Sequence, residues 1–81
     1  NKIIQETIAD IKLQLKKLPQ TENYWECDYD AFKNFVYRNV QRKNQYYNEA
    51  ISKIFNDIVV MGDTKGQLIL TSQAYYEWLN E

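Results

Sequence analysis

Side chains that can read nucleic-acid bases or contact phosphates gather in one short segment of this 81-residue chain. The segment contains Arg42, Lys43, Asn44, Gln45 and Asn48, and no acidic residue lies among them. Arginine can bond guanine through two hydrogen bonds, asparagine and glutamine can do the same with adenine, and lysine supplies charge for phosphates. The segment is therefore a candidate nucleic-acid contact. A solvent-facing helix start in a chain rich in Asn and Gln is the alternative explanation of the same pattern.

The residue types that most enzymes use are scarce. The chain has no His, a single Cys (Cys27) and no Gly-rich phosphate loop, so it offers no catalytic histidine, no intrachain disulfide and no Cys/His zinc cluster. The acids Glu26, Asp28 and Asp30 are more typical of helix caps and a solvated loop than of a cation site. We therefore expect no enzymatic activity, no cofactor and no bound metal.

Charge is divided into blocks, although the formal net charge is only −1. Residues 20–31 carry four acids and no basic residue, whereas residues 32–56 carry five basic residues and one acid. The basic block includes Lys33 and Arg38, which can share a surface with segment 42–48 if the acidic block faces elsewhere. Ordinary charges on solvated helix faces would give the same blocks.

The first part of the chain predicts a helix followed by a loop. Apolar residues recur every three or four positions from Ile4 to Leu18 and stop at Pro19, which predicts a helix; a coiled-coil seam is the alternative for such a stripe. Residues 19–30 have no helical period, and their aromatic side chains predict a loop held against the core. Asp28 or Asp30 is then expected to cap the next helix.

Residues 31–55 carry two apolar helical faces separated by a polar gap. Residues 41–45 contain no apolar side chain, so a turn there would give two helices. The absence of Gly and Pro in the gap also permits one continuous helix. We favour two, because a single helix of about 28 residues would far exceed the usual length of about 11–12 residues.

A β-hairpin is predicted over residues 58–71. Two aliphatic runs, 58–61 and 67–71, flank a short segment in which Asp63 and Gly66 suit the first and fourth positions of a type I turn. Thr71 or Ser72 would then cap a last helix. The inward-facing residues of that helix would be Ala74, Tyr75, Trp78 and Leu79.

The predicted order of three helices, a hairpin and a final helix resembles that of winged helix-turn-helix domains, over roughly residues 2–71. The resemblance implies that the helix beginning near residues 42–44 enters a major groove while the hairpin touches the flanking backbone. The pattern departs from such domains in lacking a small residue, such as Gly, between the second and third helices. The DNA-contacting residues that it implies are Arg42, Lys43, Asn44, Gln45 and Asn48, with Lys33 and Arg38 beside them and Lys65 at the wing tip.

We therefore expect a mostly helical α+β fold that is winged-helix-like, in a single small domain over residues 1–81. The start at Asn1 without an initiator Met indicates a fragment of a longer protein. The expected function is double-stranded DNA binding in a regulatory, replication or segregation protein. The alternative is a protein-interaction or oligomerisation domain without nucleic-acid contact, in which Trp25, Tyr76 and Trp78 form the interface.

The remaining expectations concern assembly, location and core. A homodimer is expected, because a domain of this size has difficulty covering apolar helices near both ends. The longest apolar run is far short of the ~20 residues that cross a membrane, and the lone Cys27 favours a cytoplasmic setting. The expected core comprises Ile8, Ile11, Leu15, Phe32, Phe35, Val36, Ile51, Ile54, Phe55, Leu68, Leu70 and Trp78.

Overall fold

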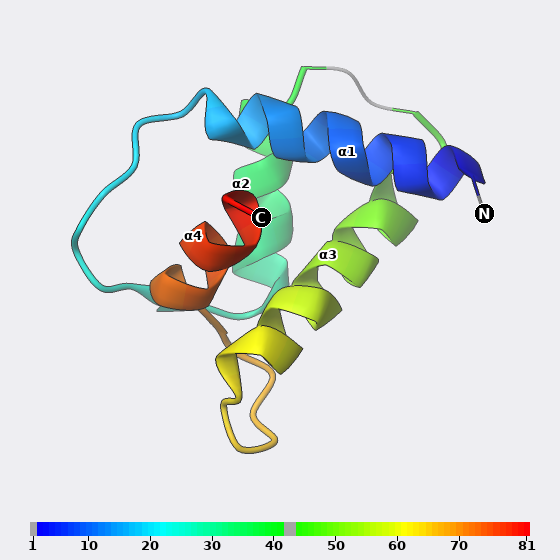
Figure 1. The fold of residues 1–81 in the computed structure, drawn as a ribbon. Helices are drawn as coiled ribbons and strands as arrows, with labels where there is room; N and C mark the ends of the chain where they lie inside the picture. Colours follow the sequence, from blue (N-terminus) through cyan, green and yellow to red (C-terminus); the bar gives the residue numbers. More distant parts are fainter. Residues whose placement is uncertain (1, 42–43) are drawn as a thin grey trace.

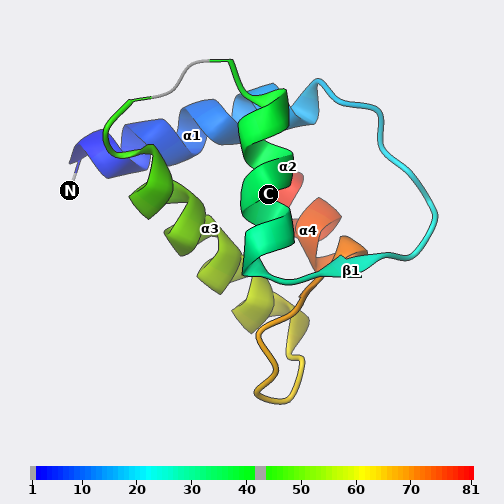
Figure 2. The same ribbon diagram turned by 180° about the vertical axis from the view of Figure 1, so that it is seen from behind.

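The computed structural model describes residues 2–41 and 44–81, in which four helices surround one core and two short strands pair beside it (Figure 1). Helix α1 lies across the ends of α2 and α3 (Figure 1). In Figure 2, α4 lies behind α2. The mostly helical α+β class expected from the sequence is confirmed. The elements in chain order are α1 (Lys2–Lys16), β1 (Glu26–Cys27), α2 (Tyr29–Asn39), α3 (Tyr47–Gly62), β2 (Leu70–Thr71) and α4 (Ser72–Leu79).

Helices α1, α2 and α4 lie in the segments where the sequence predicts helices. Helix α1 ends at Lys16, just before Pro19. Asp28 caps α2 by accepting a hydrogen bond from the backbone N–H of Ala31 at 2.9 Å, and Thr71 caps α4 through the N–H of Ala74 at 3.3 Å. Each cap satisfies a first-turn N–H that has no partner within its helix.

Helix α3 is the central element and packs against α1, α2, α4 and β2. Its buried face repeats at helical spacing from Tyr47 through Ile51 and Ile54 to Ile58. Helix α2 ends at Asn39 and α3 begins at Tyr47, so the prediction of two helices rather than one is confirmed. Beyond its last residue, Gly62, the chain leaves α3 through Asp63, which adopts a left-handed backbone conformation with φ of 47°.

The strands pair across the chain rather than within a local hairpin. β1 and β2 are antiparallel, with Glu26 opposite Thr71 and Cys27 opposite Leu70. Two further hydrogen bonds extend the pairing: the N–H of Ser72 donates to the carbonyl of Trp25 at 2.8 Å, and the N–H of Trp25 donates to Ser72 Oγ at 3.1 Å. The segment before α2 is therefore tied to the start of α4.

The predicted hairpin over residues 58–71 is wrong in its first strand. Residues 58–61 continue α3, because Ile58 extends the buried stripe of Ile54 and Phe55 by one more turn. Burial at helical spacing outweighs the β propensity of the Ile58-Val59-Val60 run. The strand partner of residues 70–71 comes instead from the aromatic segment before α2. Residues 58–71 therefore do not form the wing that the resemblance to winged-helix domains implied, and the winged-helix-like arrangement is not confirmed.

Most of the predicted core is confirmed. Ile8 and Phe35 are only half-buried, and Leu68 is exposed, because it lies in the turn between α3 and β2 rather than in a strand. Tyr75 and Leu79 are buried, as expected for the inward face of α4. The predicted residues that are buried are Ile11, Leu15, Phe32, Val36, Ile51, Ile54, Phe55, Leu70 and Trp78.

Candidate functional site

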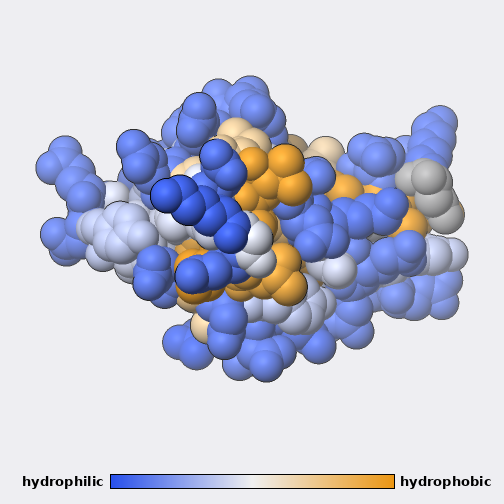
Figure 3. Space-filling model, turned by 90° about the horizontal axis from the view of Figure 1, so that it is seen from below, coloured by the Kyte–Doolittle hydropathy of each residue, from blue (hydrophilic) through white to orange (hydrophobic). Residues whose placement is uncertain are grey.

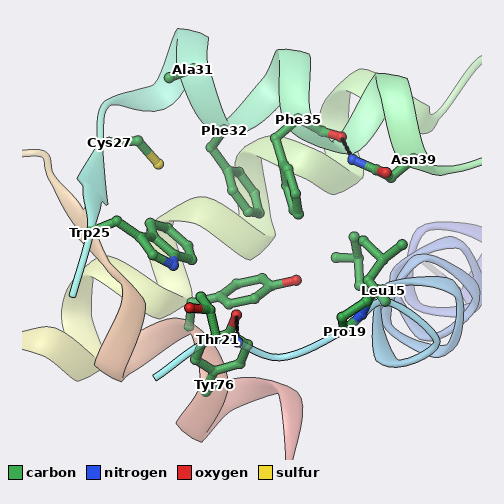
Figure 4. A pocket seen from close by; sticks show the side chains of 12 residues that line it. Leu15, Pro19, Thr21, Trp25, Cys27, Ala31, Phe32, Phe35, Asn39 and Tyr76 are labelled. Carbon is green, nitrogen blue, oxygen red and sulfur yellow. Dashed lines mark hydrogen bonds between the residues drawn. The ribbon is translucent and has the colours of Figure 1, made fainter. Parts of the chain in front are cut away.

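An apolar pocket of about 470 Å³ lies between the end of α1, the segment 19–25, β1, α2 and α4 (Figure 4). Its volume falls within the ~300–1,000 Å³ that is usual for ligand pockets. No charged side chain is among the described residues that line it. The lining residues are Leu15, Leu18, Pro19, Thr21, Trp25, Cys27, Ala31, Phe32, Phe35, Asn39, Tyr75 and Tyr76.

One wall of the pocket is a face of α2. Ala31, Phe35 and Asn39 are four residues apart and therefore lie above one another on the helix. The Phe32 and Phe35 rings point into the pocket from this wall, with their centroids 6.5 Å apart. The Asn39 side chain donates a hydrogen bond to the Phe35 carbonyl at 2.8 Å. This bond holds the Asn39 amide at the C-terminal end of the α2 wall.

The opposite wall combines α4 with the segment that precedes α2. The Trp25 ring lies 5.5 Å from Tyr75 and 6.3 Å from Tyr76, measured between centroids. The Tyr76 hydroxyl accepts a hydrogen bond from the N–H of Thr21 at 3.0 Å, which holds the segment near α4. Tilted and edge-on aromatic contacts of this kind stabilise by about 0.5–1.5 kcal/mol beyond area burial.

Cys27 and Tyr75, which both line the pocket, have raised pKa values and are neutral near pH 7. Burial, with a smaller contribution from the Asp28 charge, raises the pKa of Cys27 to about 11. Its thiol is consequently a poor nucleophile. Burial also raises the pKa of Tyr75 above its ordinary value, with the neighbouring Tyr76 adding to the shift. The pocket therefore offers apolar contact and neutral hydrogen bonds rather than charge or nucleophilic chemistry.

Exposed acids are the sequence neighbours of several lining residues. Glu22 follows Thr21, Glu26 and Asp28 flank Cys27, and Asp30 precedes Ala31; all four acids are exposed. Lys16 and Lys17 are exposed at the end of α1, between the lining residues Leu15 and Leu18. The segments that form the pocket therefore carry exposed acids around β1 and the start of α2, and exposed lysines at the end of α1.

The described residues among the predicted DNA contacts lie on α2, around the start of α3 and in the turn after α3. Asn44, Gln45 and Asn48 are exposed at the start of α3, whereas Lys65 is exposed in the turn after the end of this 16-residue helix. At 1.5 Å per residue, α3 separates the two groups by about 24 Å. Figure 1 shows the two segments at opposite ends of α3. Arg42 and Lys43 lie outside the described residues.

The other predicted DNA contacts lie on α2. Lys33 is half-buried, with its ammonium 5.9 Å from the centroid of the Tyr37 ring, and Arg38 is exposed in the last turn of the helix. Tyr37 in turn donates a hydrogen bond to the Asn48 side chain. This contact joins α2 to the start of α3. The amide oxygen of Asn48 therefore already accepts a hydrogen bond from the protein itself.

The residues predicted as a partner interface fall into two groups. Trp25 and Tyr76 line the pocket, whereas Trp78 is 5% exposed and belongs to the core, where the Lys12 ammonium lies over its ring at 4.8 Å. Sequence reasoning missed the pocket, because it assigned Leu15, Phe32 and Phe35 to the core. The available signal was the aromatic segment before α2, whose rings need a second wall of aromatic side chains to pack against.

No cluster of three or more possible metal ligands occurs in residues 2–41 and 44–81. The described helices include none with the length and apolar character needed to cross a membrane. Comparison with known proteins finds no matching family model, no matching curated protein and no matching solved structure.

Proposed function

We propose that the domain is a protein-interaction module that receives an apolar side chain of a partner protein in the pocket between α1, α2 and α4. The observation that carries the proposal is an open, aromatic-lined cavity of about 470 Å³ in the isolated chain. A small domain gains stability by filling such space, because each empty volume in a core forfeits packing contacts. Interfaces commonly place an anchor side chain in a well-packed pocket of this kind.

The charges in the segments that form the pocket favour a partner with basic residues beside the anchor. Four exposed acids between Glu22 and Asp30 lie in the segments that carry lining residues, and no lining side chain is charged. Basic residues of a partner would lie opposite these acids while its apolar side chain enters the pocket. Charges at the edge of an interface act mainly on the association rate and its salt dependence.

Two pentapeptides test the proposal: acetyl-Lys-Lys-Phe-Lys-Lys-amide and its counterpart with Tyr at the centre. In an NMR titration of the ¹⁵N-labelled domain, we expect either peptide to shift the amides of Thr21 and Trp25, and we expect added salt to weaken binding. The variant Ala31→Trp fills the pocket from the exposed start of α2 and should abolish these shifts. Asn34→Trp, on the same helix outside the pocket, is the matched control.

Two outcomes would contradict the proposal. One is the absence of shifts with both peptides at millimolar concentration. The other is a set of shifts that Ala31→Trp and Asn34→Trp change equally, since binding would then lie elsewhere on the surface.

Duplex DNA binding is a separate proposal that now depends on the side-chain chemistry of segment 42–48. Titration with duplex DNA at low and moderate salt tests it, because phosphate contacts make affinity fall steeply with salt. The double variant Arg42→Ala, Lys43→Ala should then bind more weakly and lose about one unit of salt slope for each phosphate contact removed. Equal affinity of the variant and the unaltered domain would end the proposal.

Self-association is a further proposal, supported by apolar surface at the end of α3. Val60 is 78% exposed and Leu68 is 69% exposed, and both line a shallow hollow at the turn that follows α3. Figure 3 shows apolar surface beside the polar side chains at this end of the molecule. Light scattering should give a dimer mass that the double variant Val60→Ser, Leu68→Ser reduces to that of a monomer. A monomer mass for the unaltered domain at all concentrations would contradict it.

A further inference from the structure

The Tyr75 side chain carries a hydroxyl that the protein itself does not use. Tyr75 is 2% exposed and packs edge-on against Phe32 and Phe35, with centroids 6.3 and 6.2 Å away. Among the hydrogen bonds of the described residues, none involves this hydroxyl, whereas the adjacent Tyr76 hydroxyl accepts from Thr21. The ring is thus fixed by packing while its polar atom has no partner in the chain.

Tyr75 lines the pocket, and its hydroxyl is not completely sealed from solvent. No side-chain nitrogen or oxygen among the described residues is both fully buried and without a hydrogen-bond partner. The unpartnered Tyr75 oxygen must therefore be accessible, and Tyr75 lines the pocket. Because its pKa is raised by burial, the group is a neutral hydroxyl that can donate one hydrogen bond and accept others.

We infer that the side chain received by the pocket is a tyrosine, and that the Tyr75 hydroxyl selects it over phenylalanine. The inference rests on the proposed function, in which a partner side chain enters the pocket. A phenol places its ring against Trp25 and Phe35 in the edge-on contacts already present there, and its hydroxyl can pair with that of Tyr75. A phenylalanine would displace water from Tyr75 and leave the hydroxyl unpaired.

Other anchors satisfy the pocket less well. A lysine, arginine or carboxylate tip would be desolvated among uncharged walls without an opposite charge. An aliphatic side chain would strip the Tyr75 hydroxyl of water without replacing its hydrogen bond. An indole N–H only donates, so a tryptophan would leave the Tyr75 proton without an acceptor.

The two pentapeptides introduced above, which differ only in Tyr or Phe at the centre, test this selection. We expect the unaltered domain to bind the Tyr peptide roughly 5- to 150-fold more tightly, which corresponds to the ~1–3 kcal/mol cost of leaving a buried hydroxyl unpaired. In Tyr75→Phe the preference should vanish or reverse, because the tyrosine hydroxyl then enters an apolar pocket. Tyr29→Phe is the matched control, since its ring packs on Phe55 and does not line the pocket.

The outcomes separate this inference from the proposed function. If neither peptide binds, the pocket is not an interaction site and the proposed function fails. If both bind with equal affinity, or if Tyr75→Phe keeps the preference for Tyr, the pocket stands and the role of Tyr75 is overturned. The comparison of peptides on the unaltered domain is informative even if Tyr75→Phe is poorly folded.

Discussion

Asp28 links the start of α2 to the pocket, because the helix turn that it caps carries Ala31 and Phe32. Replacing Asp28 with Ala removes the acceptor for the Ala31 N–H. We expect a loss of about 1 kcal/mol of unfolding free energy, within the ~0.5–2 kcal/mol range of such caps, measured by urea denaturation. Asp28→Ser should restore most of it.

Asp30→Ala is the control for this prediction, since Asp30 is an exposed acid in the first turn of the same helix and makes no cap hydrogen bond. Equal destabilisation by Asp28→Ala and Asp30→Ala would mean that helix-dipole charge, rather than the cap, accounts for the effect.

Tyr47 makes the core sensitive to alkaline pH. Burial, with smaller contributions from Tyr37 and Asp10, raises the pKa of Tyr47 to about 12 from an ordinary value of 10.0. Between these values the unfolded chain loses the phenol proton while the folded chain keeps it. The resulting stability is fully present below pH 10 and declines as pH rises toward 12.

Urea denaturation at a series of pH values from 8 to 11.5 measures this decline. We expect the Tyr47→Phe variant to decline less, because one of the buried phenols no longer titrates. Ser52→Ala, which changes a half-buried side chain of the same helix without removing a phenol, should decline as the unaltered domain does. A Tyr47→Phe curve parallel to that of the unaltered domain would show that Tyr47 ionises without unfolding.

At the scale of elements, Ile58 and Val60 distinguish the helix found in the last turns of α3 from the strand that the sequence predicts there. In a strand, residues two apart share one face, whereas in a helix they point in nearly opposite directions. Ile58 is 0% exposed and Val60 is 78% exposed, as the helix requires. Ile58→Ala should therefore cost about 2–5 kcal/mol of unfolding free energy, and Val60→Ala should be near neutral. Similar losses for both variants in thermal denaturation would indicate a strand.

The same turns show how far sequence reasoning reaches. Helical spacing and caps identify α1, the break between α2 and α3, and α4, because these signals involve residues within one or two turns of each other. The strand pairing of Cys27 with Leu70 has no local signal, since the partners are far apart in the chain. Local sequence therefore predicts a nearby strand partner, residues 67–71, for the aliphatic run 58–61, whereas the structure pairs Leu70 with Cys27.

The candidate site was only partly predictable for a similar reason. Trp25 and Tyr76 were expected at a partner interface, and they line the pocket. Phe32, Phe35 and Tyr75 look like core residues from their spacing, because periodicity identifies an inward face but not whether that face is completely filled. A cavity depends on how five segments meet, which no single segment encodes.

At the scale of the whole molecule, Ser72 joins the two halves of the chain. It is buried, and its Oγ accepts from the Trp25 N–H at 3.1 Å. Ser72→Ala leaves that N–H without its acceptor, so we expect a loss of about 1 kcal/mol and faster hydrogen exchange at Trp25. Peptide binding in the pocket should weaken as well, because Trp25 forms one wall.

Ser52→Ala is the control, because it makes the same Ser-to-Ala change at a half-buried position within α3. Unchanged exchange at Trp25 in Ser72→Ala would mean that the β1–β2 pairing alone holds the segment in place.

The late position of α4 in the chain has a consequence for synthesis on the ribosome. Phe32 and Phe35 acquire the Tyr75 ring as a neighbour only after residues 72–79 have emerged, and β1 acquires its partner strand only shortly before. Until then the nascent chain exposes the aromatic face of α2, a surface that chaperones bind and that promotes aggregation. Nascent chains stalled before Ser72 should therefore remain sensitive to protease, whereas chains extended until α4 clears the exit tunnel should become resistant in one step.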